Sequence, residues 1–224
     1  MSFQRVFWIV LVCLFFLNTG MARANTPVFF TFNSDNGCYN FEGSFGAKAD
    51  MDVVWSVLTD YKHVSNFISN MNSHVKKESG NDLLVEQEAG GGFLIIQEHV
   101  KALLEVHEDP FQSVSFNDVS HRDFKLYSGV WHLLPDALTG EVKVTYELLA
   151  ARNKKTPGFL TADLFGGSLG DLLDQTQREI SKRQLRKEKK AQETAHKSAT
   201  AAPTPIGSPV PTAVKGPALV SAIK

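Results

Sequence analysis

Apolar and polar residues alternate through the middle of the chain. In the segment EVKVTYELLA, Val142, Val144, Tyr146 and Leu148 fall on one face of an extended chain, and the residues between them are mostly polar. This period of two is typical of a half-buried antiparallel strand. The same pattern predicts six further strands, over residues 38–47, 72–79, 83–88, 93–106, 113–119 and 124–134.

The segments that link these strands are rich in turn-forming residues. SGND, AGGG, EDP and LTG supply glycine, proline, asparagine and aspartate at the points where the chain must reverse. These residue types favour tight turns, and tightly linked neighbours pair in antiparallel fashion. The sequence therefore predicts a curved antiparallel sheet of seven strands. Gly43, Gly46 and Gly129 are positions where it can bend or bulge.

One stretch interrupts the alternation directly after the first predicted strand. Val53, Val54, Val57 and Leu58 recur at the spacing of a helix, and residues 61–69 continue with a second helical pattern. Two short helices are therefore expected between the first and the second strand.

A longer amphipathic helix is predicted near the end of the domain. Thr156 suits the N-cap position and Pro157 suits the first turn. Apolar and small residues then form one stripe, at Phe165, Leu169, Leu172, Leu173, Thr176 and Ile180. The concave face of the sheet is the only large apolar surface on which this stripe can pack. A long helix on a curved sheet fits imperfectly, so we expect a cavity between them.

Three glycines fall inside this predicted helix, at Gly166, Gly167 and Gly170. Each one costs about 1 kcal/mol relative to alanine in a helix interior. One interpretation is that the helix breaks and restarts at Ser168. The other is that glycine lets the backbone approach the sheet or a ligand closely.

The first 24 residues have the features of a signal peptide. Arg5 precedes an apolar run, and Ala22-Arg23-Ala24 has the small residues that a signal peptidase accepts. We predict cleavage near Ala24 and a periplasmic or secreted protein; an uncleaved anchor is the alternative. Cleavage would leave Cys38 as the only cysteine, so no intramolecular disulfide is expected.

The remaining segments complete a one-domain organisation. Residues 25–37 form an N-terminal extension, and residues 38–190 contain all the predicted strands and helices. Residues 191–224 are rich in alanine, proline and threonine. Such a composition buries too little apolar surface to offset chain entropy, so a disordered tail is predicted.

Charge narrows the possible partners. The chain has 23 basic and 24 acidic residues, a balance that argues against nucleic-acid binding through net charge. Basic residues are nevertheless concentrated from Arg178 to Lys190. One interpretation is that they complement the dipole at the end of the long helix. A peripheral contact with an anionic membrane is the alternative.

The order of these elements resembles the START-type helix-grip superfamily (SRPBCC), particularly its bacterial polyketide cyclase/dehydrase and coenzyme Q-binding branch. The residues that carry the resemblance are FEGSFGAKADMDVVWSVLTDYKHVSNFISNM, GVWHL, VKVTYELLA and PGFLTADLFGGSLGDLLDQTQREI. The resemblance implies an α+β helix-grip fold, with the sheet wrapped around the long C-terminal helix. It also implies an apolar ligand between helix and sheet. A fold by itself specifies no reaction.

The expected cavity wall follows from the predicted faces of the helices and strands. Its candidate residues are Trp55, Phe67, Val100, Leu104, Phe116, Val144, Tyr146, Phe165, Leu169 and Leu172. Most of them are also expected to serve as ordinary core residues. A ligand would be bound through burial of apolar surface, at about 25 cal/mol per Å², with a few polar groups setting its orientation.

Candidate catalytic residues are few. Glu98 and His132 share the parity of apolar neighbours on their strands, so either could be a proton carrier inside the cavity. The simpler interpretation places Glu98 in water at a strand end and gives His132 a local hydrogen bond. The alternate parity of the second strand, through Tyr127 and Trp131, is also apolar. The histidines lack the spacing of metal ligands, so no metal and no cofactor are predicted.

Three functions remain open at this point. The first is an exported, non-enzymatic carrier of a lipid or an isoprenoid quinone. The second is an enzyme of the polyketide cyclase/dehydratase type. The third is an interaction protein with a filled core. A closed apolar pocket would favour the carrier. A convergent polar pair inside such a pocket would favour the enzyme, and the absence of a pocket would favour the interaction protein.

Overall fold

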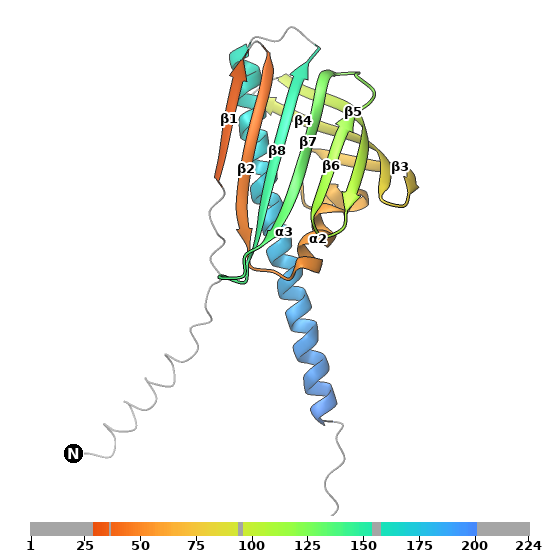
Figure 1. Ribbon diagram of the computed structural model, residues 1–224, viewed down its shortest axis with the longest axis vertical. Helices are drawn as coiled ribbons and strands as arrows, with labels where there is room; N and C mark the ends of the chain where they lie inside the picture. Colours follow the sequence, from red (N-terminus) through yellow and green to blue (C-terminus); the bar gives the residue numbers. More distant parts are fainter. Residues whose placement is uncertain (1–28, 36, 94–95, 154–157, 201–224) are drawn as a thin grey trace, which may run out of the picture. The chain divides into compact units, whose positions relative to one another are not determined.

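The computed structural model describes residues 29–35, 37–93, 96–153 and 158–200 (Figure 1). The predicted signal peptide, the proposed helix cap at Thr156 and Pro157, and residues 201–224 lie outside this part of the chain. No helix in the described part is both long and apolar enough to cross a membrane.

The described strands form one antiparallel sheet in the order β1-β2-β8-β7-β6-β5-β4-β3. Its strands are β1 (Phe29–Asp35), β2 (Cys38–Ala47), β3 (Met71–Ser79), β4 (Asp82–Phe93), β5 (Ile96–Asp109), β6 (Ser113–Asp118), β7 (Phe124–Pro135) and β8 (Val142–Arg152). The seven predicted strands correspond to β2–β8. The sheet is strongly curved, and β3 to β5 wrap toward the side on which α3 lies (Figure 1).

The eighth strand, β1, corrects the predicted strand count and lies in the segment treated as an N-terminal extension. It pairs with β2 from Phe29 opposite Ser44 to Asp35 opposite Cys38. Gly37, between the two strands, has a φ of 76°, a conformation that favours glycine. The sequence Asn-Gly before Cys38 is a strong hairpin signal that sequence analysis overlooked.

The helices occupy the predicted places. The α-helix α2 (Met51–Leu58) and the 3₁₀-helix η2 (Tyr61–Asn66) lie between β2 and β3, and α3 (Gly158–Thr200) follows β8. We call residues 51–70, from α2 to the turn before β3, the elbow. Figure 1 shows α3 running along the face of β2 and β8, with α2 next to it at one end of the sheet.

The end of α3 differs from the sequence prediction. The helix continues to Thr200, although a disordered tail was expected from Ala191. Alanine, glutamine, glutamate and lysine between these positions are good helix formers, which accounts for the extension. The chain divides into two compact units after Lys187. In the second unit the described side chains from Lys189 to Lys197 are exposed.

The glycines of α3 do not interrupt it. The helix is continuous from Gly158 onward, so the interpretation in which it breaks and restarts at Ser168 is wrong. A Cβ at Gly167 would meet nothing within 4 Å, and close approach does not explain this glycine either. The close approach of helix and sheet occurs instead at Gly43 on β2, where a Cβ would collide with Leu173.

The main core forms where α3 meets β2 and β8. The side chains of Leu173 and Ile180 on α3 are almost fully buried, together with Phe41 and Phe45 on β2. Val53, Val54 and Val57 of α2 belong to the same cluster. The apolar stripe therefore faces the sheet, as the sequence predicted for Leu169, Leu173 and Ile180.

Candidate functional site

A pocket lies between the elbow, α3 and the curved sheet, next to the main core. Its volume is about 100 Å³. We call it the elbow pocket. Its walls come from α2, η2, every strand from β3 to β8, and two residues of α3. They comprise Val57, Leu58, Asp60, Tyr61, Val64, Phe67, Ile68, Met71, Ser73, Val85, Gln87, Leu104, Val106, Val114, Phe116, Tyr127, Trp131, Tyr146, Leu172 and Thr176.

Aromatic rings form the sheet side of this pocket. Trp131 stacks on Tyr146 with centroids 4.2 Å apart, and Phe116 lies 5.5 Å from Tyr127. Adjacent positions on β6, β7 and β8 bring these rings together, because Phe116 pairs with Gly129 and Trp131 pairs with Tyr146. A Cβ at Gly129 would lie 2.6 Å from the Phe116 ring, so glycine is what lets that ring lie against β7.

Two buried hydroxyl groups accompany the aromatic rings. Burial raises the pKa of Tyr127 to about 12, although a hydrogen bond from Tyr146 lowers it. Burial also raises the pKa of Tyr146 well above its usual value, and the interaction with Tyr127 adds to this. Both side chains are therefore neutral at physiological pH, and they can exchange hydrogen bonds with a polar group but cannot act as bases.

Asp60 is the only carboxylate among the described residues that line the pocket. Burial would raise its pKa, but hydrogen bonds from Arg183 and His63 outweigh burial and lower it. Asp60 is consequently ionised and engaged in an ion pair. Among the described lining residues, no second carboxylate and no histidine accompanies it.

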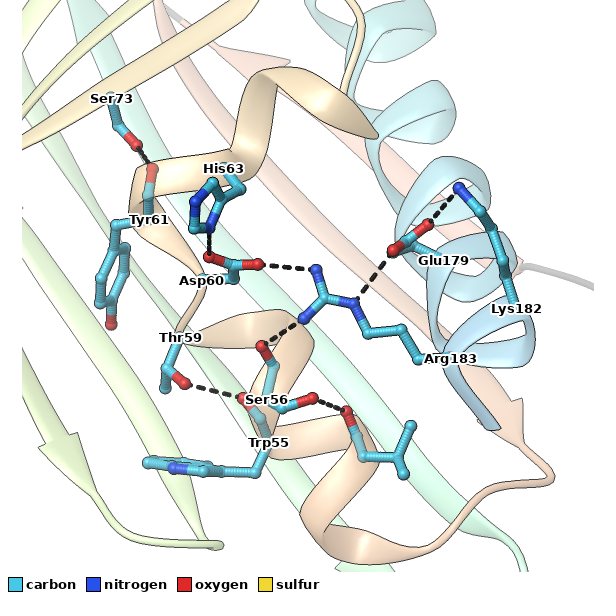
Figure 2. A network of polar contacts seen from close by, with 11 residues as sticks. Trp55, Ser56, Thr59, Asp60, Tyr61, His63, Ser73, Glu179, Lys182 and Arg183 are labelled. Atoms are coloured by element: carbon cyan, nitrogen blue, oxygen red, sulfur yellow. Dashed lines mark hydrogen bonds and ion pairs between the residues drawn. The ribbon is translucent and has the colours of Figure 1, made fainter. Parts of the chain in front are cut away.

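The ion pair of Asp60 belongs to a network that joins α3 to the elbow (Figure 2). Arg183 on α3 places Nη2 2.7 Å from Asp60 Oδ2, and its Nη1 donates to the carbonyl oxygen of Ser56 at 2.9 Å. Its Nε donates to Glu179 Oε1 at 3.0 Å. The guanidinium also lies 5.5 Å above the ring of Phe67, which lines the pocket. One side chain thus connects α2, η2 and α3 at the rim.

Five of the predicted wall residues line the elbow pocket. They are Phe67, Leu104, Phe116, Tyr146 and Leu172. Their role in binding a ligand stays a prediction.

The other predicted wall residues lie elsewhere. Val144 and Leu169 are buried in the main core. Val100 packs on the small cluster around Phe124, and the Trp55 ring lies 5.5 Å from that of Phe111. The side chain of Phe165 lies outside the described part of the chain.

Of the two candidate proton carriers, the structure describes the side chain of His132 only. His132 alternates with Trp131 and Leu133, which face the core, so its side chain is on the opposite face of β7. The sequence left the inward face of this strand open, and a bulge between Phe124 and Leu126 shifts its register so that Trp131 faces inward. The backbone of Glu98 lies in β5, but its side chain is outside the described part.

Several pocket residues were missed by the sequence analysis. Tyr127 and Trp131 follow the alternate parity of β7, whose inward face the sequence left unresolved. Ser73 and Gln87 are polar side chains that line the wall, where an apolar pattern gives no signal. Arg183 follows Thr176 and Ile180 at helical spacing, so its place on the stripe was the available signal for a residue facing the elbow.

The basic run on α3 is largely engaged within the protein. Four of its cations, Arg178, Lys182, Arg183 and Lys187, are ion-paired, and Lys187 contacts both Asp50 and Asp52. Arg178 and Lys182 pair with carboxylates of α3 itself, whereas Arg183 and Lys187 also join α3 to carboxylates near α2. Within the described residues, no cluster of side chains suits a metal ion.

A second depression of about 680 Å³ lies over β3 to β6. It is larger than the elbow pocket but open to solvent and lined mostly by polar side chains. His107 and Asp82 on its wall interact at 2.7 Å, and both are exposed. A broad polar depression encloses a ligand poorly, so the elbow pocket is the better candidate site.

Solved structures of other proteins share this fold. The Zhui aromatase/cyclase from Streptomyces has a TM-score of 0.55 at 13% identity, over 65% of this chain and 95% of that chain. A StAR-related lipid transfer protein from Xanthomonas axonopodis has a TM-score of 0.53 at 17% identity, over 67% of this chain and 98% of that chain. Human StAR-related lipid transfer protein 5 has a TM-score of 0.53 at 12% identity, over 80% of this chain and 96% of that chain. The sequence itself matches no protein-family profile and no curated protein.

At these identities the likeness concerns the fold. The chain has the START-type helix-grip fold that the sequence resemblance predicted.

Proposed function

We propose that this protein binds and carries an apolar or amphipathic small molecule in the elbow pocket. The observation that carries the proposal is a pocket with an aromatic wall, left unfilled where α3 crosses the curved sheet. Proteins of the same fold that are named as lipid transfer proteins support it. We infer a lipid or an isoprenoid quinone as the ligand class, because flat or flexible apolar groups suit an aromatic surface.

The polar groups of the pocket suggest how such a ligand is oriented. Tyr127 and Tyr146 are neutral and lie against the aromatic wall, so they can bind the hydroxyl or carbonyl group of an otherwise apolar molecule. The remaining contacts would be apolar. This division matches small-molecule sites in general, where a few polar groups set orientation.

The size of the pocket sets a requirement on this function. A volume of about 100 Å³ holds roughly three water molecules, whereas ligand pockets commonly measure about 300–1,000 Å³. A lipid or quinone can therefore enter only if part of the wall moves outward. The elbow is the part of the wall that is not a strand or a long helix.

We propose export as well, on the signal-peptide pattern of residues 1–24. A contact with an anionic membrane has narrower support, since only Arg186, Lys189 and Lys190 of the basic run lack a described carboxylate partner.

A cyclase or dehydratase is the second candidate function. The similarity of the fold to an aromatase/cyclase and the aromatic wall of the pocket favour it. The engagement of Asp60 with Arg183 and the outward position of His132 argue against it. Unchanged turnover of a polyketide substrate after Glu98→Gln would remove the last named proton carrier.

The carrier function is tested by native mass spectrometry with lipid extraction of the purified protein, followed by titration with decylubiquinone and with oleate. We expect a bound apolar compound, and we expect Leu172→Trp to reduce binding at least about tenfold because the indole fills the pocket. Leu185→Trp, on the same helix at an exposed position, is the matched control. The carrier function is wrong if no compound co-purifies from several hosts and neither probe binds.

A further inference from the structure

We propose that Arg183 is a latch that holds the second half of the elbow, residues 60–70, closed against α3, and that ligand enters where these two segments separate. The inference deepens the proposed function, on which it rests, by naming the entrance and the residue that controls it. It starts from a difference between the two halves of the elbow.

The first half of the elbow buries more apolar side chains than the second half does. Helix α2 buries Val53, Val54 and Val57 in the main core. In the second half only Ile68 is buried, and no residue of η2, from Tyr61 to Asn66, is. Segments with few buried apolar contacts open at lower free-energy cost than the core does. The second half of the elbow is therefore the part of the pocket wall that can move most readily.

Polar contacts hold this half from two sides. Toward the sheet, the Tyr61 hydroxyl donates to Glu108 at 2.8 Å, and the backbone N–H of Gly90 donates to the Asn70 carbonyl at 2.7 Å. Toward α3, the backbone N–H of Ser69 donates to Gln175 at 2.6 Å, at an exposed position. The other described polar contacts of residues 60–70 toward α3 run through Arg183.

Arg183 is suited to holding a movable segment. Its guanidinium contacts Asp60, the Ser56 carbonyl and Glu179 at once, in the directed geometry that lysine lacks (Figure 2). The side chain is 24% exposed and that of Glu179 only 8%, so the contacts are shielded from water without being sealed from it. Such bonds can break and re-form as the segment moves, while Ser56 stays fixed on α2.

Opening at this seam leads directly into the pocket. Phe67 lies under the guanidinium and also lines the pocket, and across the seam Leu172 and Thr176 of α3 line it too. Separation of these residues would widen the pocket toward solvent while the sheet side remains closed. This supplies the expansion that a ligand larger than about 100 Å³ needs.

The latch is tested by thiol labelling, which requires no ligand. A cysteine is placed on the pocket wall by Thr176→Cys, in a full chain whose Cys13 and Cys38 are replaced by serine. Thr176 is 3% exposed, so its replacement reacts with 5,5′-dithiobis(2-nitrobenzoate) only when the pocket opens. Val144→Cys in the same background, at a position that is 0% exposed, reports opening of the core.

We expect Arg183→Gln to raise the labelling rate of the pocket cysteine about tenfold or more, the effect of losing hydrogen bonds to a charged group. The core cysteine should label at an unchanged rate. Arg178→Gln is the matched control, because Arg178 pairs with Asp174 on the same helix and does not contact the elbow. Asp60→Asn, which breaks the pair from the elbow side, should act like Arg183→Gln and serves if that variant fails to fold.

Two results would overturn the latch. One is equal labelling of the pocket cysteine in the Arg183→Gln and Arg178→Gln backgrounds. The other is an equal increase at the pocket and core cysteines, because Arg183 would then stabilise the whole fold rather than the elbow. Either result leaves the carrier function standing, and a failure of the ligand titrations leaves the latch standing.

Discussion

Two adjacent residues of α3 meet very different surroundings. Leu173 is fully buried against β2, where the absence of a side chain at Gly43 leaves room for it. Leu172, one position earlier, is half-buried and lines the elbow pocket. The same helix thus packs tightly on one side and borders a void on the other. A curved sheet can match a straight helix closely along only one line of contact, and here that line follows β2 and β8.

The comparison separates stability from binding. Residues around Leu173 should determine whether the domain folds, and residues around Leu172 should determine what it holds. Apolar residues on the two sides look alike in the sequence, yet their substitution should have different consequences.

The largest expected effect is on the packed side. Leu173→Ala should lower the free energy of unfolding by about 3–4 kcal/mol, because it removes a fully buried side chain and leaves a cavity. Leu172→Ala should cost less than about 1.5 kcal/mol, because its side chain already borders empty space. Urea denaturation followed by circular dichroism measures both. Equal losses would mean that the two sides of α3 are packed alike.

The next effect concerns the glycine that permits the tight contact. Gly43→Ala should destabilise the fold by about 1–3 kcal/mol, because the new Cβ collides with Leu173. In combination with Leu173→Ala, the penalty of Gly43→Ala should largely disappear, since the two side chains compete for one space. Simple additivity in the double-mutant cycle would contradict this packing. Gly167→Ala, at a helix position with open space around it, is the control and should be neutral or stabilising.

A smaller effect is expected at acidic pH, on the stability of the elbow next to the pocket. Burial would raise the pKa values of Asp60 and Glu179, but hydrogen bonds with Arg183 outweigh burial and hold both below their usual values. Each carboxylate therefore stabilises the folded state above about pH 4, and this contribution disappears as the pH falls through the folded-state pKa values. The protection factors of the η2 amides, which compare the measured exchange rate with the intrinsic rate at the same pH, should fall below pH 4, and more steeply in the native protein than in Arg183→Gln.

One outcome would contradict the predicted pH dependence of η2. If η2 amides exchange with the same pH profile in both proteins, Arg183 does not set the ionisation of its two partners. The other titratable groups near this network are His63, Lys182 and the Tyr61–Glu108 pair. Lys182→Gln is a useful control because Lys182 contacts Glu179 alone among these groups.

The smallest expected effect is on the ionisation of the tyrosines in the aromatic wall of the pocket, which ultraviolet absorbance measures. Burial raises the pKa of Tyr127 to about 12 and raises the pKa of Tyr146 well above its usual value, so both should stay neutral to high pH. Ultraviolet titration at alkaline pH should lose a late-titrating tyrosine in Tyr127→Phe. Because the folded-state pKa is raised, the native protein should lose stability between about pH 10 and pH 12, and Tyr127→Phe should lose less. Identical alkaline profiles would place the Tyr127 hydroxyl in water.

The sequence by itself determined most of the framework. Alternation along β2 and β8, the helical spacing of the elbow and the stripe on α3 each follow from burial of one face, and burial of one face is visible as a period. The extra strand β1 was also encoded, in the Asn-Gly turn before Cys38. Five wall residues, among them Phe116 and Leu172, were identified because their faces were assigned correctly.

Only the tertiary structure decided what each face meets. Periodicity assigns Leu169, Leu172 and Leu173 to one stripe, but it cannot say which of them packs on Gly43 and which borders a pocket. A single bulge in β7 reversed the inward parity, which placed Tyr127 and Trp131 in the wall and turned His132 away. Arg183 likewise reads as one cation in a basic run until Asp60 and Ser56, more than a hundred residues earlier, come within hydrogen-bonding distance. A sequence pattern records which side of an element is buried, whereas the space between two elements depends on their relative curvature and placement.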